Sequence, residues 1–181
     1  DIYPEGLVKE KCISKYRNIL CDIFRPGHFD GVTTVVNTFF KIIKPNNSYF
    51  GEKDYQQMKL INEMVGIKKL NINIISCPSV RDNNGMSLSS RNSNFNSLQS
   101  EIFQSLAKKI SLLIESLKQK DTIINFDEFK NELSKININK IDYLEIRDES
   151  NLEITNDYTS ARLFVAVYID DIRIIDNFKL Y

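Results

Sequence analysis

The segment GEKDYQQ, residues 51–57, combines side chains that could bind an anion. Gly51 would let a ligand approach the backbone closely, and the exposed N–H groups at the start of a helix favour negative charge. Lys53 adds a mobile positive charge, and Asp54 could accept hydrogen bonds from ribose hydroxyl groups. Gln57 lies one turn beyond Lys53, so both could face one cleft. The same residues also fit an ordinary strand-to-helix turn with a charged helix start.

A second candidate is MSLSSRN, residues 86–92. The hydroxyl groups of Ser89 and Ser90 can donate hydrogen bonds, and Arg91 offers a planar fork that matches phosphate oxygens. By composition alone, the segment also fits a solvated linker rich in Ser and Asn.

The only histidine, His28, lies in RPGHF at residues 25–29. An imidazole can act as an acid, a base or a phosphate donor near neutral pH. No acid or nucleophile stands beside it in the sequence, so a histidine that bonds to a turn backbone, or has a supporting role, is the alternative.

The elements that position these residues follow from apolar periodicity and from Gly and Pro. Asp30 is a plausible N-cap of the helix expected at 30–44, and Gly66 is a plausible C-terminal cap of the helix expected at 54–65. The elements expected in the first half are helices at 15–23 and 30–44, a strand at 48–50, a helix at 54–65 and a strand at 70–77. This order predicts an α/β unit with parallel strands, in which ligands bind at the carboxyl ends of the strands.

The second half has a different pattern. Residues 80–96 are polar and without a period, which predicts a long loop. Beyond it the sequence predicts helices at 98–117 and 126–136 and strands at 141–147 and 163–169, with Asp170-Asp171 turning into a hairpin strand at 172–175. This half therefore reads as a small α+β domain with an antiparallel sheet.

Composition narrows the function classes. Lys and Arg total 24 and Asp and Glu total 24, which argues against duplex DNA or an anionic membrane as partner. Cys12, Cys21 and Cys77 include no C-x-x-C pair, which favours a reducing compartment such as the cytoplasm and argues against a structural zinc site. No apolar stretch approaches the roughly 20 residues of a membrane span.

Taken together and in this order, four segments resemble the pantothenate synthetase family. They are RPGHF, GVTTVVNTFFKIIKPN, FGEKDYQQMKLI and CPSVRDNNGMSLSSRN, and IDYLEIRD at 141–148 and RIIDN at 173–177 add to the match. The resemblance implies that residues 1–79 are the C-terminal portion of a Rossmann-like nucleotidylyltransferase domain that binds ATP and pantoate. Residues 80–181 would be a C-terminal α+β lid domain.

The resemblance also implies a reaction. Members of the family join pantoate to β-alanine through a pantoyl adenylate, using ATP and Mg²⁺, and form homodimers. Lys53, Ser89, Ser90 and Arg91 would be catalytic, and Gln57 would bind pantoate. The residues that would contact ATP are Gly51, Glu52, Lys53, Asp54, Val80, Leu88, Ser89, Ser90 and Arg91. The loop at 81–92 would move to close over the site.

One family feature is not found in this sequence. The family carries a His-x-Gly-His motif, whereas the only histidine here is His28. We therefore expect that motif to lie before Asp1, and the chain alone to make no pantothenate. Two alternatives remain open: an adenylate-forming enzyme for another acid, and a noncatalytic dimerisation or binding module of the same fold.

Overall fold

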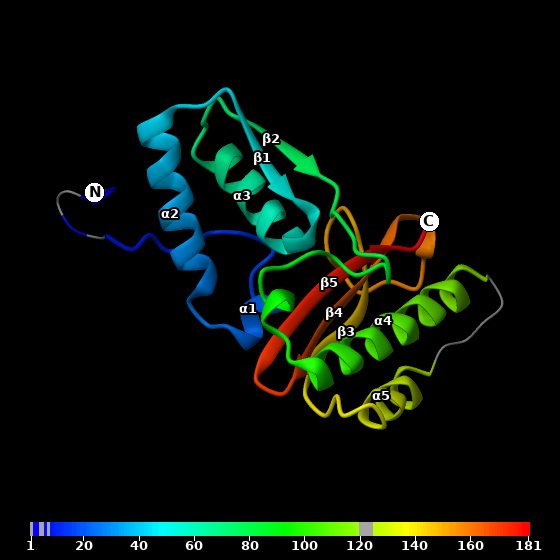
Figure 1. The fold of residues 1–181 in the computed structure, drawn as a ribbon. Helices are drawn as coiled ribbons and strands as arrows, with labels where there is room; N and C mark the ends of the chain where they lie inside the picture. Colours follow the sequence, from blue (N-terminus) through cyan, green and yellow to red (C-terminus); the bar gives the residue numbers. More distant parts are fainter. Residues whose placement is uncertain (1, 4–5, 7, 120–124) are drawn as a thin grey trace. The chain divides into compact units, whose positions relative to one another are not determined.

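The computed structural model describes residues 2–3, 6, 8–119 and 125–181 (Figure 1). The chain divides into two compact units, residues 1–78 and 79–181. The division falls one residue before the boundary expected from the sequence, and each unit is described separately below.

Unit 1 is built on a pair of parallel strands. β1 (Asn47–Gly51) pairs with β2 (Asn73–Cys77) so that Gly51 lies opposite Cys77. The strands are parallel because α3 (Tyr55–Ile67) carries the chain back from the end of β1 to the start of β2. The α/β unit predicted from the sequence is confirmed, although β2 begins at Asn73 rather than at residue 70.

Two helices cover this pair of strands. α2 (His28–Ile43) and α3 share an apolar cluster in which Phe40 packs with Ile61 and Val65. Phe50 of β1 and Ile74 of β2 pack against the same cluster. Of the apolar stripe at 32–43, expected from its helical spacing to be core, Val32, Val36 and Phe40 lie in or against this cluster. Val35, Phe39 and Ile43 are instead 37%, 41% and 64% exposed, so only part of the stripe is core.

Residues 15–23 do not form the predicted helix. Only α1 (Cys21–Phe24) is helical. Asn18 and Leu20 have φ of 60° and 47°, values that a continuous right-handed helix does not allow. The prediction was wrong because the periodicity of such a short segment does not reveal these turns.

Asp30 is not the N-cap of α2. The N-cap is Gly27, in a left-handed conformation with φ 76°. The carboxylate of Asp30 instead accepts hydrogen bonds from the backbone N–H of Cys12, at 2.9 Å, and from Arg17, at 2.7 Å. These contacts, the Cys12 N–H first, lower the pKa of Asp30, and they tie the N-terminal segment to α2.

Gly66 lies inside α3 rather than capping it. The left-handed residue at the end of this helix is Lys69, with φ 51°. Its N–H donates to the carbonyl of Gly66 at 3.1 Å, and the N–H of Leu70 donates to that of Val65 at 3.0 Å. This is the Schellman pattern, three residues later than the sequence suggested.

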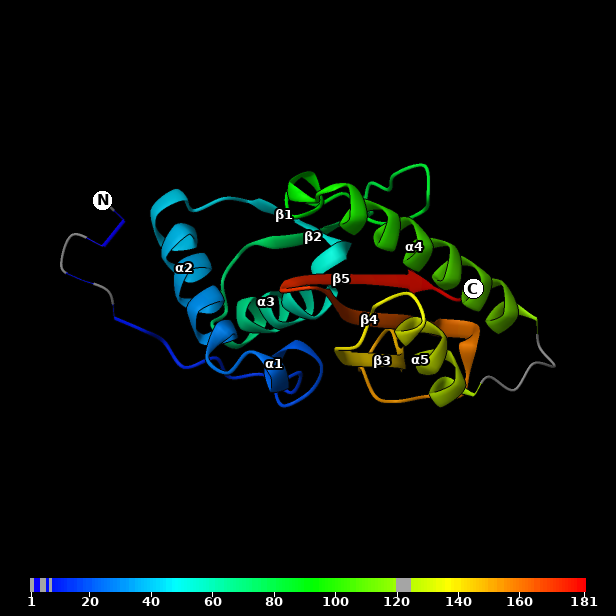
Figure 2. The same ribbon diagram turned by 60° about the horizontal axis from the view of Figure 1, so that its bottom comes forward.

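Unit 2 holds an antiparallel sheet of three strands, in the order β3-β4-β5 (Figure 2). They are β3 (Ile141–Asp148), β4 (Ala161–Ile169) and β5 (Ile172–Lys179), and the helices are α4 (Ser97–Lys118) and α5 (Phe126–Ser134). Asp170, with φ 50°, begins the two-residue turn from β4 to β5. The predicted α+β organisation is confirmed, with a last strand longer than expected.

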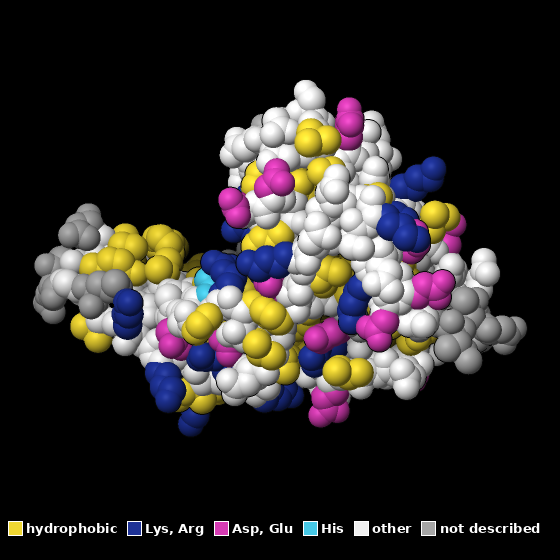
Figure 3. Space-filling view, turned by 90° about the horizontal axis from the view of Figure 1, so that it is seen from below, with side chains coloured by type: hydrophobic (Ala, Val, Ile, Leu, Met, Phe, Trp, Pro, Cys, Tyr) yellow, Lys and Arg dark blue, Asp and Glu magenta, His cyan; other side chains and the backbone are white. Residues whose placement is uncertain are grey.

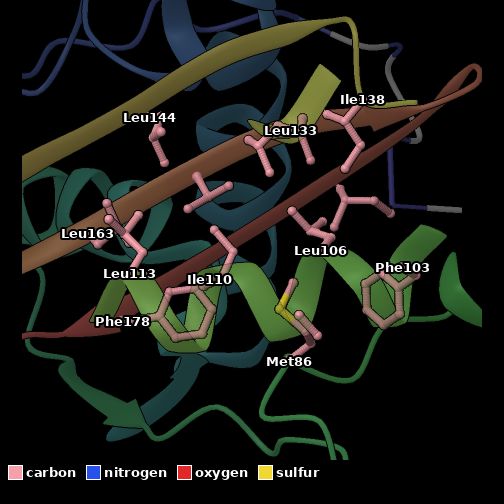
Figure 4. Packing of buried hydrophobic residues seen from close by; sticks show 14 of the residues in the cluster. Met86, Phe103, Leu106, Ile110, Leu113, Leu133, Ile138, Leu144, Leu163 and Phe178 are labelled. Carbon is pink, nitrogen blue, oxygen red and sulfur yellow. The ribbon is translucent and has the colours of Figure 1, made fainter. Parts of the chain in front are cut away.

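The core of unit 2 joins both helices to one sheet (Figure 4). Leu106, Ile110 and Leu113 of α4 pack with Leu163 of β4 and with Leu133 of α5. Met86 also belongs to this core and is 2% exposed, although it comes from the loop at 80–96. The loop is therefore anchored near its middle.

Candidate functional site

Gly51 ends β1 and opens a short 3₁₀ turn, Glu52–Asp54, which leads into α3. Gly51 is extended, with φ −69°, and a Cβ added to it would meet no atom within 4 Å. The fold alone therefore does not require glycine here. The open space lies at the carboxyl end of parallel strands, where α/β sheets bind ligands.

Lys53 and Asp54 lie on this turn with their charged groups close together. The Lys53 Nζ is 3.9 Å from Asp54 Oδ2, and the side chains are 21% and 48% exposed. Asp54 is the N-cap of α3 but accepts no side-chain capping hydrogen bond. Its carboxylate oxygens therefore remain available to accept hydrogen bonds from another group, such as the ribose hydroxyls expected from the sequence.

Glu52 links the two strand ends. The hydroxyl of Ser76, on β2, donates to Glu52 Oε1 at 2.8 Å. This contact holds the turn against the neighbouring strand, so Glu52 has a positioning role within unit 1.

Gln56, which the sequence analysis did not single out, is more buried than Gln57. It is 6% exposed and accepts a hydrogen bond from the backbone N–H of Cys21 at 3.0 Å. It also donates to the carbonyls of Tyr16 and Ile19, each at 2.9 Å. Gln57 is half-buried on the first turn of α3. Only the partners of Gln56, about 40 residues earlier in the chain, could have distinguished the two glutamines.

The loop that holds Ser89 and Ser90 begins as a narrow hairpin. The N–H of Leu88 donates to the carbonyl of Val80 at 2.8 Å, and Arg81 bridges to Ser87. The side chains of Val80 and Leu88 are 69% and 57% exposed. The carbonyl of Val80, a residue expected to contact ATP, thus already has one backbone partner.

Asp176 of β5 anchors this hairpin. Like Gln56, it was not among the residues predicted from the sequence. Its Oδ2 accepts from the N–H of Ser87 at 2.7 Å and from Arg81 Nη1 at 3.0 Å. Arg81 also donates to the carbonyl of Asn177 at 2.8 Å. The sequence gives no local signal for contacts that span some 90 residues.

Ser89, Ser90 and Arg91 follow the anchored hairpin. The Ser89 hydroxyl accepts from the N–H of Arg91 at 3.2 Å, and Arg91 Nη1 lies 3.3 Å from the carbonyl of Arg173. Ser90 and Arg91 are exposed. A cavity of about 580 Å³ opens beside them, and it is lined by Asp82, Asn84, Leu88, Ser89, Ser90, Asn92, Phe95, Ser100, Phe103 and Gln104.

Some classes of site are not seen in the part of the chain that the structure describes. Within it, no group of three His, Cys, Asp or Glu residues could hold a metal ion, and the cysteines are free thiols. No described helix is long and apolar enough to cross a membrane.

Comparison with known proteins gives consistent results for nearly the whole chain. The family model for pantoate-beta-alanine ligase matches residues 1–179. A pantothenate synthetase of Azobacteroides pseudotrichonymphae is 38% identical over 98% of this chain and 64% of its own length. One of Thermodesulfovibrio yellowstonii is 39% identical over 97% of this chain and also 64% of its own length. The chain thus spans just under two thirds of these curated relatives.

Solved structures agree in fold as well as sequence. The crystal structure of pantoate-beta-alanine ligase from Francisella tularensis, complexed with beta-gamma ATP and beta-alanine, matches with a TM-score of 0.80 and 39% identity. It covers 99% of this chain, which spans 61% of the crystallised chain. The enzyme from Thermus thermophilus matches with a TM-score of 0.85 and 30% identity, over 99% and 66% of the two chains. On the family match to residues 1–179, this chain belongs to the pantoate-beta-alanine ligase family.

Proposed function

We propose that this chain is part of a pantothenate synthetase, an ATP-dependent ligase that condenses pantoate with β-alanine. The observation that carries the proposal is the family match over residues 1–179, which includes both candidate segments. The pantoate carboxylate attacks the α-phosphorus of ATP, forming pantoyl adenylate and releasing pyrophosphate. The amine of β-alanine then displaces AMP.

The residues singled out from the sequence have roles in this reaction. Lys53 and Arg91 neutralise charge that builds on the pyrophosphate, and Ser89 and Ser90 donate hydrogen bonds to it. Gln57 binds pantoate. Asp54 accepts from the ribose hydroxyls, supported by its carboxylate being free of capping contacts. The remaining nucleotide contacts are Gly51, Glu52, Val80 and Leu88.

Mg²⁺ fits this reaction as an ion carried by the nucleotide. It is usually held by phosphate oxygens, waters and one or two carboxylates rather than by a protein cage. The half-exposed carboxylate of Asp54 suits that arrangement. When bound, the ion would neutralise phosphate charge.

Closure over the adenylate is assigned to residues 88–91. Met86 and Ser87 are 2% and 4% exposed and fixed by the core and by Asp176. Residues 88–91, which follow them, can move without breaking the contacts of Met86 and Ser87. The moving segment proposed here is therefore shorter than the loop predicted at 81–92. A homodimer in the cytoplasm completes the proposal.

The substrate is tested by ATP–pyrophosphate exchange in the complete gene product. Exchange should require pantoate and should not respond to glycerate, malate or β-alanine alone. If another acid drives exchange and pantoate does not, the second candidate, an adenylate-forming enzyme for a different acid, replaces this one. If no acid drives exchange, the noncatalytic module is the better description.

The 181-residue chain by itself is proposed to make no pantothenate, because it holds no His-x-Gly-His motif. The test is to assay the purified chain with ATP, pantoate, β-alanine and Mg²⁺. Sustained pantothenate formation would show that the motif is dispensable.

A further inference from the structure

Arg25 and His28 form a side-chain pair that the proposed roles above do not use. Arg25 Nη1 lies 3.0 Å from His28 Nε2. The backbone N–H of His28 also donates to the carbonyl of Arg25, at 3.1 Å. A guanidinium can only donate hydrogen bonds, so Nε2 must be the acceptor. The contact is a hydrogen bond in the tautomer that carries its proton on Nδ1.

The pair lies at the amino end of α2, and a short series of contacts connects it to α3. The N–H of Cys21 donates to Gln56 on the first turn of α3, at 3.0 Å, and Cys21 Sγ is 4.0 Å from Arg25 Nη1. α2 runs back along the sheet into β1, so its amino end lies near the carboxyl ends of the strands (Figure 1). The pair therefore lies at the same end of unit 1 as the turn that carries Lys53.

Arg25 has donors to spare. Among the described residues, no carboxylate pairs with it, and its Nε and Nη2 have no hydrogen-bond partner. Arg17, in the same unit, differs: it pairs with Asp22 and Asp30, each at 2.7 Å. Arg25 is half-buried, and the chain's one histidine is visible at the surface (Figure 3).

A half-buried guanidinium with an open Nε and Nη2 edge is a receptor for a planar oxyanion. Those two groups donate in parallel, which matches the two oxygens of a carboxylate. The contact from His28 is on Nη1, so it fixes the plane of the guanidinium without using this edge. The uncapped amino end of α2, where Gly27 offers no side chain, adds favourable potential for an anion.

We propose that Arg25 binds the carboxylate of one of the two acid substrates, pantoate or β-alanine, and that His28 is a positioning residue that orients Arg25. This inference rests on the proposed function. It adds Arg25, from the RPGHF segment, to the proposed substrate-binding residues, which so far are the nucleotide contacts and Gln57.

The test is an NMR titration of the Arg25 Nε–H resonance in the complete gene product, with the signal assigned by its loss in Arg25→Lys. Pantoate, β-alanine and ATP are added separately, followed by pantoamide and β-alaninamide, which lack the carboxylate. We expect a saturable shift with pantoate or β-alanine that its amide does not produce. Which acid shifts the resonance identifies the source of the carboxylate.

Variants supply the second readout. Arg25→Gln should weaken binding of that acid about tenfold or more, as for loss of a hydrogen bond to a charged group. Lys41→Gln, the same charge change at the other end of α2, should not. His28→Leu should weaken binding as well, whereas His28→Gln, which keeps an acceptor, should restore part of it.

Three results would overturn the proposal: no shift with either acid, equal shifts with the amides, or a shift with ATP alone. Unchanged acid binding in His28→Leu would refute the positioning role. Pantoate-dependent pyrophosphate exchange in the unmodified protein is measured in parallel. The absence of exchange counts against the proposed function. Exchange together with an Arg25 resonance that neither acid shifts counts against this inference only.

Discussion

The carboxylate of Asp176 accepts a hydrogen bond from the backbone N–H of Ser87 at 2.7 Å, which ties the last strand of the sheet to the serine loop. Arg81 pairs with the same oxygen at 3.0 Å. Because the Asp176 side chain is 1% exposed and Arg81 30%, the two charges are only partly screened by water. This buried carboxylate therefore fixes the position of the backbone immediately before Ser89 and Ser90.

Asp176→Ala should therefore destabilise unit 2 by about 2–4 kcal/mol, since it leaves the Arg81 charge and the Ser87 N–H without their partner. Chemical denaturation measures this. Asp171→Ala, an exposed aspartate in the adjacent turn, is the control and should change the free energy of unfolding by less than about 0.5 kcal/mol. Equal effects of the two substitutions would show that Asp176 is no anchor.

Gln56 and Gln57 should separate stability from substrate binding. Gln56→Leu leaves two backbone carbonyls and one N–H without their partner and should cost about 2–4 kcal/mol of unfolding free energy. Gln57→Leu should leave stability nearly unchanged and raise the KM for pantoate. Thermal melts and steady-state kinetics on both variants check this, and a stable Gln56→Leu with weak pantoate binding would reverse the two assignments.

Gly51→Ala tests whether the glycine serves the ligand. The added methyl group meets no atom within 4 Å and the backbone is extended, so the unfolding free energy should change by less than about 1 kcal/mol. If a nucleotide lies against this backbone, the KM for ATP should rise about tenfold or more, as expected when a close contact is blocked. An unchanged KM would remove Gly51 from the ATP site.

Asp148 should make stability depend on acid pH. Hydrogen bonds from the hydroxyls of Ser150 and then Ser160 lower its pKa from 3.8 to about 2. A lowered pKa in the folded state means that the contribution is present above about pH 4 and is lost as the pH falls through about 2. Asp148→Asn should therefore melt at a lower temperature than the parent at pH 6.

The difference between Asp148→Asn and the parent should shrink steadily between about pH 4 and pH 2. Asp127→Asn, whose side chain is 87% exposed, is the control and should show a small difference throughout. A gap for Asp148→Asn that stays constant down to pH 2 would mean that the charge of Asp148 contributes nothing.

Local patterns were enough to predict most of the fold. The periodicity of 98–117 predicts α4, and the turn at Asp170-Asp171 predicts the hairpin of β4 and β5. Besides the helix wrongly predicted at 15–23, the errors lie at helix ends. There Asp30 and Gly66 have the right residue types for caps, but tertiary contacts or the actual end of the helix give them other positions.

The candidate site was predictable only in part. Gly51, Lys53 and Asp54 could be singled out as candidates because a β–α turn brings them together within four residues. Gln56 and Asp176 could not, because their partners lie far away in the sequence and neither residue type indicates burial. The open Nε and Nη2 edge of Arg25 likewise could not be predicted, because it depends on there being no carboxylate partner among the described residues, which the sequence does not reveal.

The most direct test of the central claim is pantoate-dependent ATP–pyrophosphate exchange in the complete gene product, compared between Lys53→Ala and the control Lys41→Ala, whose side chain is 66% exposed. We predict that Lys53→Ala lowers the exchange rate about a hundredfold or more with its melting temperature preserved, as for loss of a charge that stabilises the transition state, and that Lys41→Ala exchanges at the parental rate. Equal exchange rates in the two variants would contradict the assignment of this turn to the ATP site.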